Sequence, residues 1–252
     1  MEWFVKEDSI VRSIWGKADT VLFIFAGAAG EFALNKAVDW LYFTGKLPAD
    51  PIGRLFSTVV YARQIIFSEM EKAHATIDRI GSIHAQVENA RSSKIPDWAY
   101  RDVLYMLVHY SVASYELLER RLTMEEKNEV YDVFLRFAQR MQLRDLPATY
   151  TDWLISYKQH LANDLVRSRY TDDLFLQYKE HLGAFRYWIL LEAQKELMPP
   201  ITKKMLGFGR SRMMKIIIPA YRAALFLGIG HPLRSMILPA QYRKQVNALD
   251  II

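Results

Sequence analysis

The sequence predicts an all-α protein. Hydrophobic residues make up 51% of its 252 residues and charged ones 24%, the balance of a globular chain with a sizeable core. Apolar residues recur every three or four positions, and no stretch alternates with period two for more than four residues. The 11 Gly and 9 Pro are also few for a turn-rich β-sandwich. We therefore expect one helical domain over residues 1–252.

Start and stop signals place the helices in order along the chain. Pro51 suits the first turn of a helix. Two capping boxes, Ser68–Glu71 and Thr123–Glu126, mark helix starts, because a hydroxyl and a carboxylate each accept a hydrogen bond from a free backbone N–H group. The expected helices cover residues 51–67, 68–91, 96–122, 124–142, 150–167, 171–182 and 184–198, followed by a segment around 216–218 that ends at Pro219.

Charge is unevenly distributed along the chain. The net charge is +5, but residues 203–252 hold nine Lys or Arg against one acidic residue, so residues 1–202 carry −3. Residues 203–244 mix these cations with apolar residues. This pattern fits a C-terminal helix packed on the bundle or a helix at an anionic membrane interface. Nucleic acid is not an expected partner, because no recognition motif accompanies the basic residues.

Several classes of site and location are excluded or disfavoured. The absence of cysteine excludes disulfides, iron–sulfur clusters and a cysteine nucleophile. There is no phosphate-binding glycine loop, and one Glu-x-x-His unit, Glu71–His74, is too few for a di-iron bundle. The apolar run Val21–Ala29 is too short to cross a bilayer, and no secretory signal precedes it. We expect a cytoplasmic protein, with membrane association through residues 203–244 as an open addition.

Two consecutive predicted helices carry residues suited to a haem pocket. Arg54 and Thr58 lie four residues apart, on one face of the first helix. On the second helix His84 shares an apolar face with Ile80, and Gly81 lies one turn before it, where a flat group can approach closely. Imidazole, guanidinium and hydroxyl groups would then serve as axial ligand, propionate partner and donor to bound oxygen. The alternatives are a core histidine bonded to a backbone carbonyl, an interhelical arginine salt bridge and a threonine bonded back to its own helix.

The other histidines give weaker signals. His109 has apolar helical neighbours and is expected in the core, whereas His160 and His181 lie beside charged residues and are expected at the surface. His231 falls in a glycine-rich turn. His74 is about 80° around its helix from His84, so the two are not expected to ligate one iron.

An ordered set of short motifs extends over roughly residues 20–165. It consists of Asp50-Pro51-Ile52-Gly53-Arg54-Leu55, Thr58, Phe67, Ile83-His84-Ala85, Val87, Ala113-Ser114-Tyr115-Glu116 and Leu122-Thr123. In order and spacing it resembles the oxygenases related to the latex-clearing protein (rubber oxygenase) and the fungal MpaB protein. The resemblance implies a globin-like, all-α bundle that holds one haem b.

The resemblance also implies roles for individual residues. His84 falls at the proximal iron ligand, and Arg54 and Thr58 fall on the family's haem-pocket Arg-x-x-x-Thr pair. Thr58 would donate a hydrogen bond to bound dioxygen, and Arg54 would pair with a propionate or polarise the distal side. Asp39 would remove a proton from a hydrophobic, allylic substrate such as an isoprenoid or fatty chain, with Glu31 as the second candidate.

The chain departs from the family pattern at two places. Ser57 stands where latex-clearing enzymes carry a lysine, so no lysine-ligated resting state is expected. Ala26-Gly27-Ala28 stands where many bacterial relatives have Ala-His-Pro.

The sequence leaves three functions open. The first is a haem-dependent oxygenase enzyme that takes a hydrophobic substrate and dioxygen. The second is a haem-binding carrier or sensor without oxygenase turnover, favoured by the missing lysine. The third is a cofactor-free helical protein of a membrane surface, in which Arg54, Thr58 and His84 are structural. Haem content separates the third from the others, and oxygen consumption separates the first two.

Overall fold

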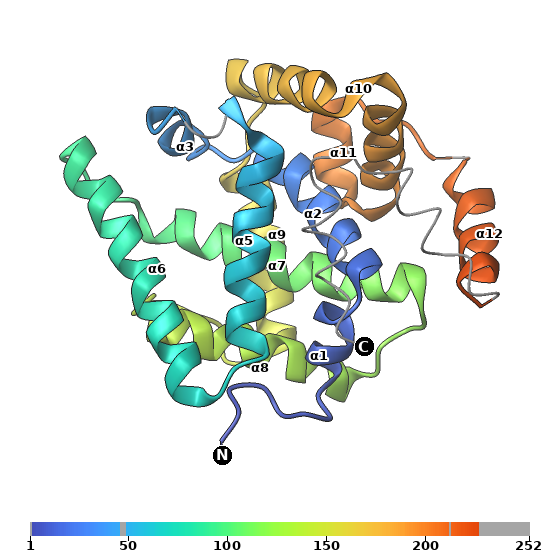
Figure 1. The fold of residues 1–252 in the computed structure, drawn as a ribbon. Coiled ribbons are helices and arrows are strands. Elements are labelled where there is room, and N and C mark those ends of the chain that lie inside the picture. Colours follow the sequence, from blue (N-terminus) through green and yellow to red (C-terminus); the bar gives the residue numbers. More distant parts are fainter. Residues whose placement is uncertain (1, 46–48, 212, 227–252) are drawn as a thin grey trace.

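The computed structural model describes residues 2–45, 49–211 and 213–226, and the all-α prediction is confirmed for this part of the chain. Two isolated bridges are its only β-type pairings. Figure 1 shows α5 crossing in front of α7, with α6 on the left, α10 across the top and α12 on the right. The described helices are α1 (Ile10–Trp15), α2 (Ala18–Phe32), α3 (Asp39–Phe43), α5 (Pro51–Ile66), α6 (Met70–Arg91), α7 (Asp97–Leu118), α8 (Met124–Arg140), α9 (Tyr150–Asn163), α10 (Arg169–Leu197), α11 (Pro200–Leu206) and α12 (Met214–Phe226).

Helix α2 passes through the middle of the bundle and packs against α7 and α10. Two of its glycines make this close packing possible. A Cβ atom on Gly27 would lie 2.3 Å from the ring of Tyr110, and one on Gly30 would lie 2.7 Å from Met198 Sδ. The small residues of α2 are therefore a packing feature that holds the helices of the core together.

One of the two predicted capping boxes forms. Thr123 Oγ1 accepts from the Glu126 N–H, and the Glu126 carboxylate accepts from the Thr123 N–H at 2.8 Å. The box at Ser68 is wrong, because α6 begins only at Met70 without a side-chain cap. The N-terminal segment occupies this place instead, since the Met70 N–H donates to the carbonyl of Glu2 and the Phe4 N–H to that of Ser68.

Glycine and proline interrupt the later helices as predicted, with one exception. Gly183 breaks α10 with a positive φ of 74°, so the two predicted helices on either side of it are confirmed. Pro219 lies inside α12 rather than at its end, so the predicted stop is wrong. Good helix formers such as Ala220 and Ala223 follow it, and α12 continues through them despite the lost hydrogen bond and the steric clash that an interior proline brings.

The described part of the basic C-terminal region packs on the bundle. Helix α12 contacts α7 and α10, and Met214 and Ile218 are buried there. This favours the packed-helix alternative for α12, whereas residues 227–244, including His231, lie outside the described residues. Among the described helices none is both long enough and apolar enough to cross a bilayer.

Candidate functional site

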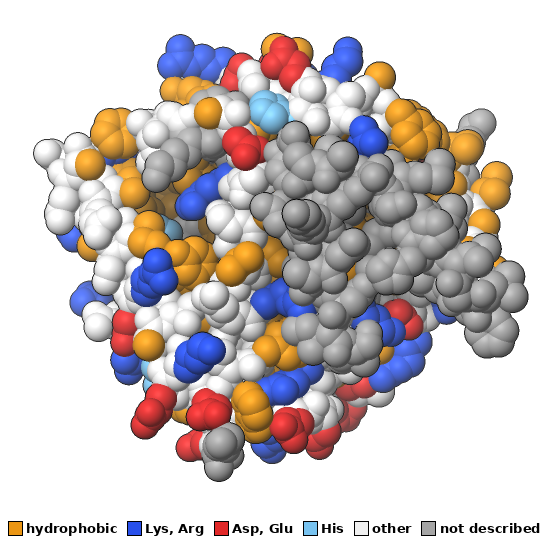
Figure 2. Space-filling model, in the orientation of Figure 1, with side chains coloured by type: hydrophobic (Ala, Val, Ile, Leu, Met, Phe, Trp, Pro, Cys, Tyr) orange, Lys and Arg blue, Asp and Glu red, His pale blue; other side chains and the backbone are white. Residues whose placement is uncertain are grey.

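A cavity of about 310 Å³ lies between α2, α5, α6, α7 and α8. Its volume is at the lower end of the range for small-molecule sites, which runs from roughly 300 to 1,000 Å³. In Figure 2 hydrophobic side chains lie recessed over α5 and α6 on this face of the molecule. The cavity is lined mainly by hydrophobic side chains, and the polar groups that reach it belong to Arg54, Thr58, Tyr61, His84, Tyr100 and Tyr178. The structure therefore brings the predicted Arg54, Thr58 and His84 together in one apolar cavity.

The first residues of α5 explain how Arg54 and Thr58 are positioned. Asp50 caps the helix, and its carboxylate accepts from the Gly53 N–H at 2.8 Å. A Cβ atom on Gly53 would lie 2.0 Å from the same carboxylate, so a larger residue here would displace the Asp50 cap. Pro51 occupies the first turn. The Asp-Pro-x-Gly start thus fixes where α5 begins, and with it the turn of helix on which Arg54 lies.

His84 projects from α6 with a free imidazole. Its Nδ1 atom is buried without a hydrogen-bond partner, and neither ring nitrogen bonds to a described residue. The ring packs edge-on against Tyr100, at 5.1 Å between centroids. Burial lowers the pKa of His84, the nearby positive charge of Arg54 lowers it further, and Glu88 opposes both effects. The neutral imidazole is the form in which histidine binds a metal.

The structure tests the three purely structural roles that the sequence allows for His84, Arg54 and Thr58. His84 makes no bond to a described backbone carbonyl, and the Arg54 guanidinium forms no ion pair or hydrogen bond with a described residue. The Thr58 hydroxyl does donate back to its own helix, to the carbonyl of Arg54 at 3.3 Å. Of the three alternatives, only the back-bonded threonine is therefore present in the described part of the chain.

Gly81 lies one turn before His84 and leaves open space beside α6. A Cβ atom built on Gly81 would meet nothing within 4 Å. Gly81 does not itself line the cavity, and no described atom crowds this position of α6. An imidazole and a guanidinium that reach one apolar cavity, and that have no polar partner among the described residues, fit the donor set of a haem site.

The two acidic candidates do not line the cavity. Asp39 lies at the start of α3, where its carboxylate accepts from Arg91 at 2.6 Å. Glu31 is fully buried and accepts from the hydroxyls of Tyr110 and Tyr157, at 2.9 and 2.7 Å. Burial raises the pKa of Glu31 to about 7, against the lowering effect of these two hydrogen bonds.

The remaining histidines differ in burial. His109 packs among aromatic rings, and its Nε2 atom is buried, as expected for a core residue. His181 is partly exposed and lies near the carbonyls of Gln177 and Ala49. The surface prediction for His160 is wrong, because this residue is 4% exposed. The charged neighbour behind that prediction, Lys158, is two residues away and so lies on nearly the opposite side of α9.

Comparison with known proteins identifies the family. Residues 14–228 match the family described as ER-bound oxygenase mpaB/B'/Rubber oxygenase, catalytic domain. No curated protein and no solved structure matches the chain. The family match includes α2, all the helices around the cavity and the whole of α12, and so extends beyond the roughly 20–165 covered by the motifs. The chain therefore belongs to the mpaB and rubber oxygenase family.

Proposed function

We propose that this protein is a haem b-dependent oxygenase with His84 as the proximal iron ligand and a hydrophobic, isoprenoid or fatty substrate. The observation that carries the proposal is the His84 imidazole, which faces the apolar cavity and has no hydrogen-bond partner among the described residues. Family membership supports the reaction class. The apolar cavity supports the substrate class, because its walls offer contacts mainly to hydrocarbon.

Haem bound here would supply the iron on which dioxygen is activated. His84 would hold the iron through one ring nitrogen. The Arg54 guanidinium, which has no ion pair with a described residue, would meet a propionate. The space beside Gly81 would admit the macrocycle, and the hydrophobic walls would exclude water from the reacting groups.

Two residues have a less direct part in the proposal. The Thr58 hydroxyl donates to the Arg54 carbonyl here, and rotation about its C–O bond would offer the same proton to a hydrogen-bond acceptor in the cavity. Asp39 would remove a proton from substrate only after its ion pair with Arg91 opens. The second candidate function is a haem carrier or sensor without turnover. One observation supports it: no carboxylate in the described part of the chain lines the cavity, so no acidic side chain is in place there to take a proton from a substrate.

Titration of haem into the purified haem-free protein tests the proposal. The Soret absorbance is expected to saturate at one haem per chain. The loaded protein is then expected to consume oxygen when a polyisoprenoid or a polyunsaturated fatty acid is added. Saturation without oxygen consumption would support the carrier or sensor instead, and the absence of a Soret band would overturn both haem functions.

The substitution Gly81→Leu is expected to weaken haem binding by about tenfold or more without destabilising the haem-free protein. The new side chain would fill space that the macrocycle needs, and such overpacking costs about 1–3 kcal/mol. Without haem the side chain meets nothing at its Cβ atom, and leucine is the better helix former. Haem titration and urea unfolding measure the two effects.

The matched control for this prediction is Ser82→Leu, one residue along α6 at an exposed position. It is expected to leave haem affinity unchanged. Equal haem affinity in Gly81→Leu and the wild-type protein would show that the macrocycle does not lie beside Gly81.

A further inference from the structure

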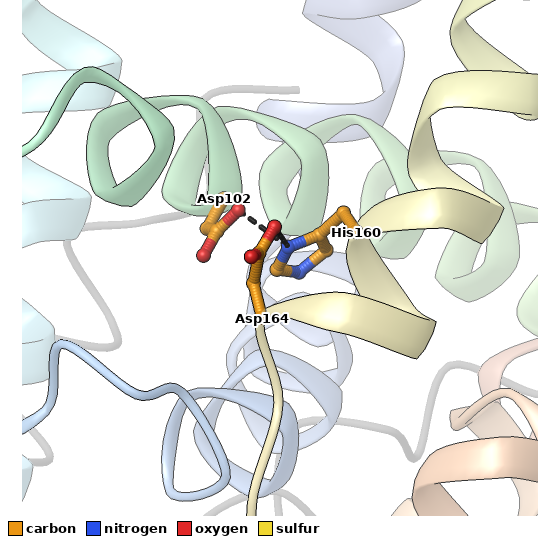
Figure 3. A group of neighbouring side chains, drawn as sticks. All are labelled: Asp102, His160 and Asp164. Atoms are coloured by element: carbon orange, nitrogen blue, oxygen red, sulfur yellow. Dashed lines mark hydrogen bonds and ion pairs between the residues drawn. The ribbon is translucent and has the colours of Figure 1, made fainter.

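A buried group of charged side chains, none of which lines the cavity, joins α7 to the end of α9. In Figure 3 the side chains of Asp102, His160 and Asp164 converge on one point. His160 Nδ1 is in contact with Asp102 Oδ1 and lies 3.3 Å from Asp164 Oδ2. One potential ligand atom from each residue lies within 4.8 Å of the other two. The three side chains thus present one nitrogen and two oxygens to a common point.

Backbone pairing holds this group in place. The segment after α2 pairs with the end of α9, through the Lys36 N–H to the Asp164 carbonyl at 3.0 Å and the Val166 N–H to the Leu34 carbonyl at 2.7 Å. Within that segment, the Asn35 side-chain amide donates to Asp102 Oδ2 at 2.7 Å. This hydrogen bond orients the carboxylate of Asp102 so that its other oxygen faces His160.

The group has more acidic side chains than its protein partners can neutralise. Glu31 brings a third carboxylate, with its Oε1 atom 4.0 Å from His160 Nε2. Both atoms are buried and have no hydrogen-bond partner among the described residues. No Lys or Arg of the described ranges forms an ion pair with Glu31, Asp102 or Asp164. His160 can supply at most one positive charge to these three carboxylates, and the remaining negative charge is costly unless further protons or a bound cation neutralise it.

We propose that Asp102, His160 and Asp164 bind one divalent transition-metal ion of the Zn²⁺ type, at a site separate from the cavity. The ligands are His160 Nδ1 and one oxygen from each aspartate. One imidazole with two carboxylates suits Zn²⁺ better than Mg²⁺, which prefers oxygen ligands alone.

Two features around the three ligands match those of known metal centres. A metal-binding histidine commonly donates its other ring N–H to a carboxylate, and Glu31 lies on that side of His160. Asp164 is the most accessible of the three ligands, with 29% of its side chain exposed, so it provides an entry route from solvent. The bound ion connects α7 to the end of α9 and replaces the protons that neutralise the group in its absence.

Isothermal titration calorimetry, with Zn²⁺ added to the full-length, chelator-treated protein, tests the proposal. The wild-type protein is expected to bind one Zn²⁺ per chain, to gain thermal stability from it and to show no competition from Mg²⁺. The Asp164→Asn variant is expected to bind at least about tenfold more weakly, since loss of even an indirect partner of a metal ligand costs 10–100-fold in affinity. Its partly exposed position makes the folded state tolerant of this change.

Two matched variants separate this site from other acidic groups and from the haem pocket. Asp172→Asn changes an exposed aspartate that pairs with Arg167, and it is expected to leave Zn²⁺ affinity unchanged. His84→Ala is also expected to retain the Zn²⁺ site. Co²⁺ provides a readout on the wild-type protein alone, because visible absorption bands should appear on Co²⁺ addition and be lost when Zn²⁺ displaces it. Absence of Zn²⁺ binding by the wild-type protein, or unchanged affinity in Asp164→Asn, would overturn the proposal.

Discussion

Replacement of His84 with alanine is expected to abolish stoichiometric haem binding while leaving the haem-free fold intact. Loss of an indirect partner of a metal ligand costs 10–100-fold in affinity, so removal of the ligand itself should cost more than about a hundredfold. The fold should tolerate the change, because His84 makes no hydrogen bond to a described residue and only packs edge-on against Tyr100. Soret absorbance during haem titration measures the first effect, and urea unfolding of the haem-free protein measures the second.

The matched control for this prediction is His74→Ala, on the same helix. His74 packs edge-on against Phe4 and does not line the cavity, so this variant is expected to bind haem like the wild-type protein. Free imidazole is expected to restore part of the Soret band in His84→Ala, because it can occupy the space of the deleted ring. A full Soret band in His84→Ala at one equivalent of haem would contradict the assignment of the ligand.

The polar groups of the cavity are the main physical argument for a ligand. Buried polar atoms in native proteins nearly always have partners, and an exception calls for an explanation. The imidazole of His84 is such an exception, and Arg54 is a cation without an ion pair to a described residue in the same apolar cavity. A ligand that carries both a metal ion and a carboxylate would satisfy both groups at once, because the imidazole could bind the metal and the guanidinium could pair with the carboxylate.

The amphipathic helices of this fold could be predicted from the sequence, whereas the buried helix α2 and the shortest helices could not. The predicted helix over residues 51–67 matches α5 closely, because an apolar stripe and a proline in the first turn mark it. Helix α2 is buried over most of its surface and has no polar face, so its sequence lacks the periodic signal of a helix. Helices α3 and α11 contain five and seven residues, too few for a periodic pattern.

The polar residues of the cavity could be predicted from the sequence for a similar reason. Arg54 and Thr58 lie one turn apart on one helix, and His84 is on the next, so local spacing and the family motif predict the group. Asp102 and His160, by contrast, are distant in sequence and meet only because α7 packs against α9. In the sequence, the nearby Lys158 indicates a surface position for His160, which is wrong. A signal was still present, since His160 and Asp164 are four residues apart and share one face near the helix end.

Acid is expected to destabilise the haem-free fold through His109, and His109→Gln should remove this part of the acid sensitivity. Burial lowers the pKa of His109 from its ordinary value of 6.5 to about 4, although a hydrogen bond with the backbone of Leu197 opposes this effect. Between these two pH values the unfolded chain binds the proton and the folded one does not, so stability falls as pH falls through this window. At about 1.4 kcal/mol per pKa unit, the loss approaches 3 kcal/mol by pH 4.

Urea unfolding of the wild-type protein and His109→Gln at pH 8, 7 and 5 measures this effect, because contributions from other titrating groups cancel in the difference. The difference should stay constant between pH 8 and 7 and shift by about 2 kcal/mol against the wild-type protein by pH 5. The rings of Tyr110 and Tyr157 pack against His109, and both hydroxyls donate to Glu31. Glu31 takes up a proton below pH 7, so it offers the imidazolium no fixed negative charge. A constant difference down to pH 5 would therefore mean that His109 is protonated within the fold, against the cost of its burial.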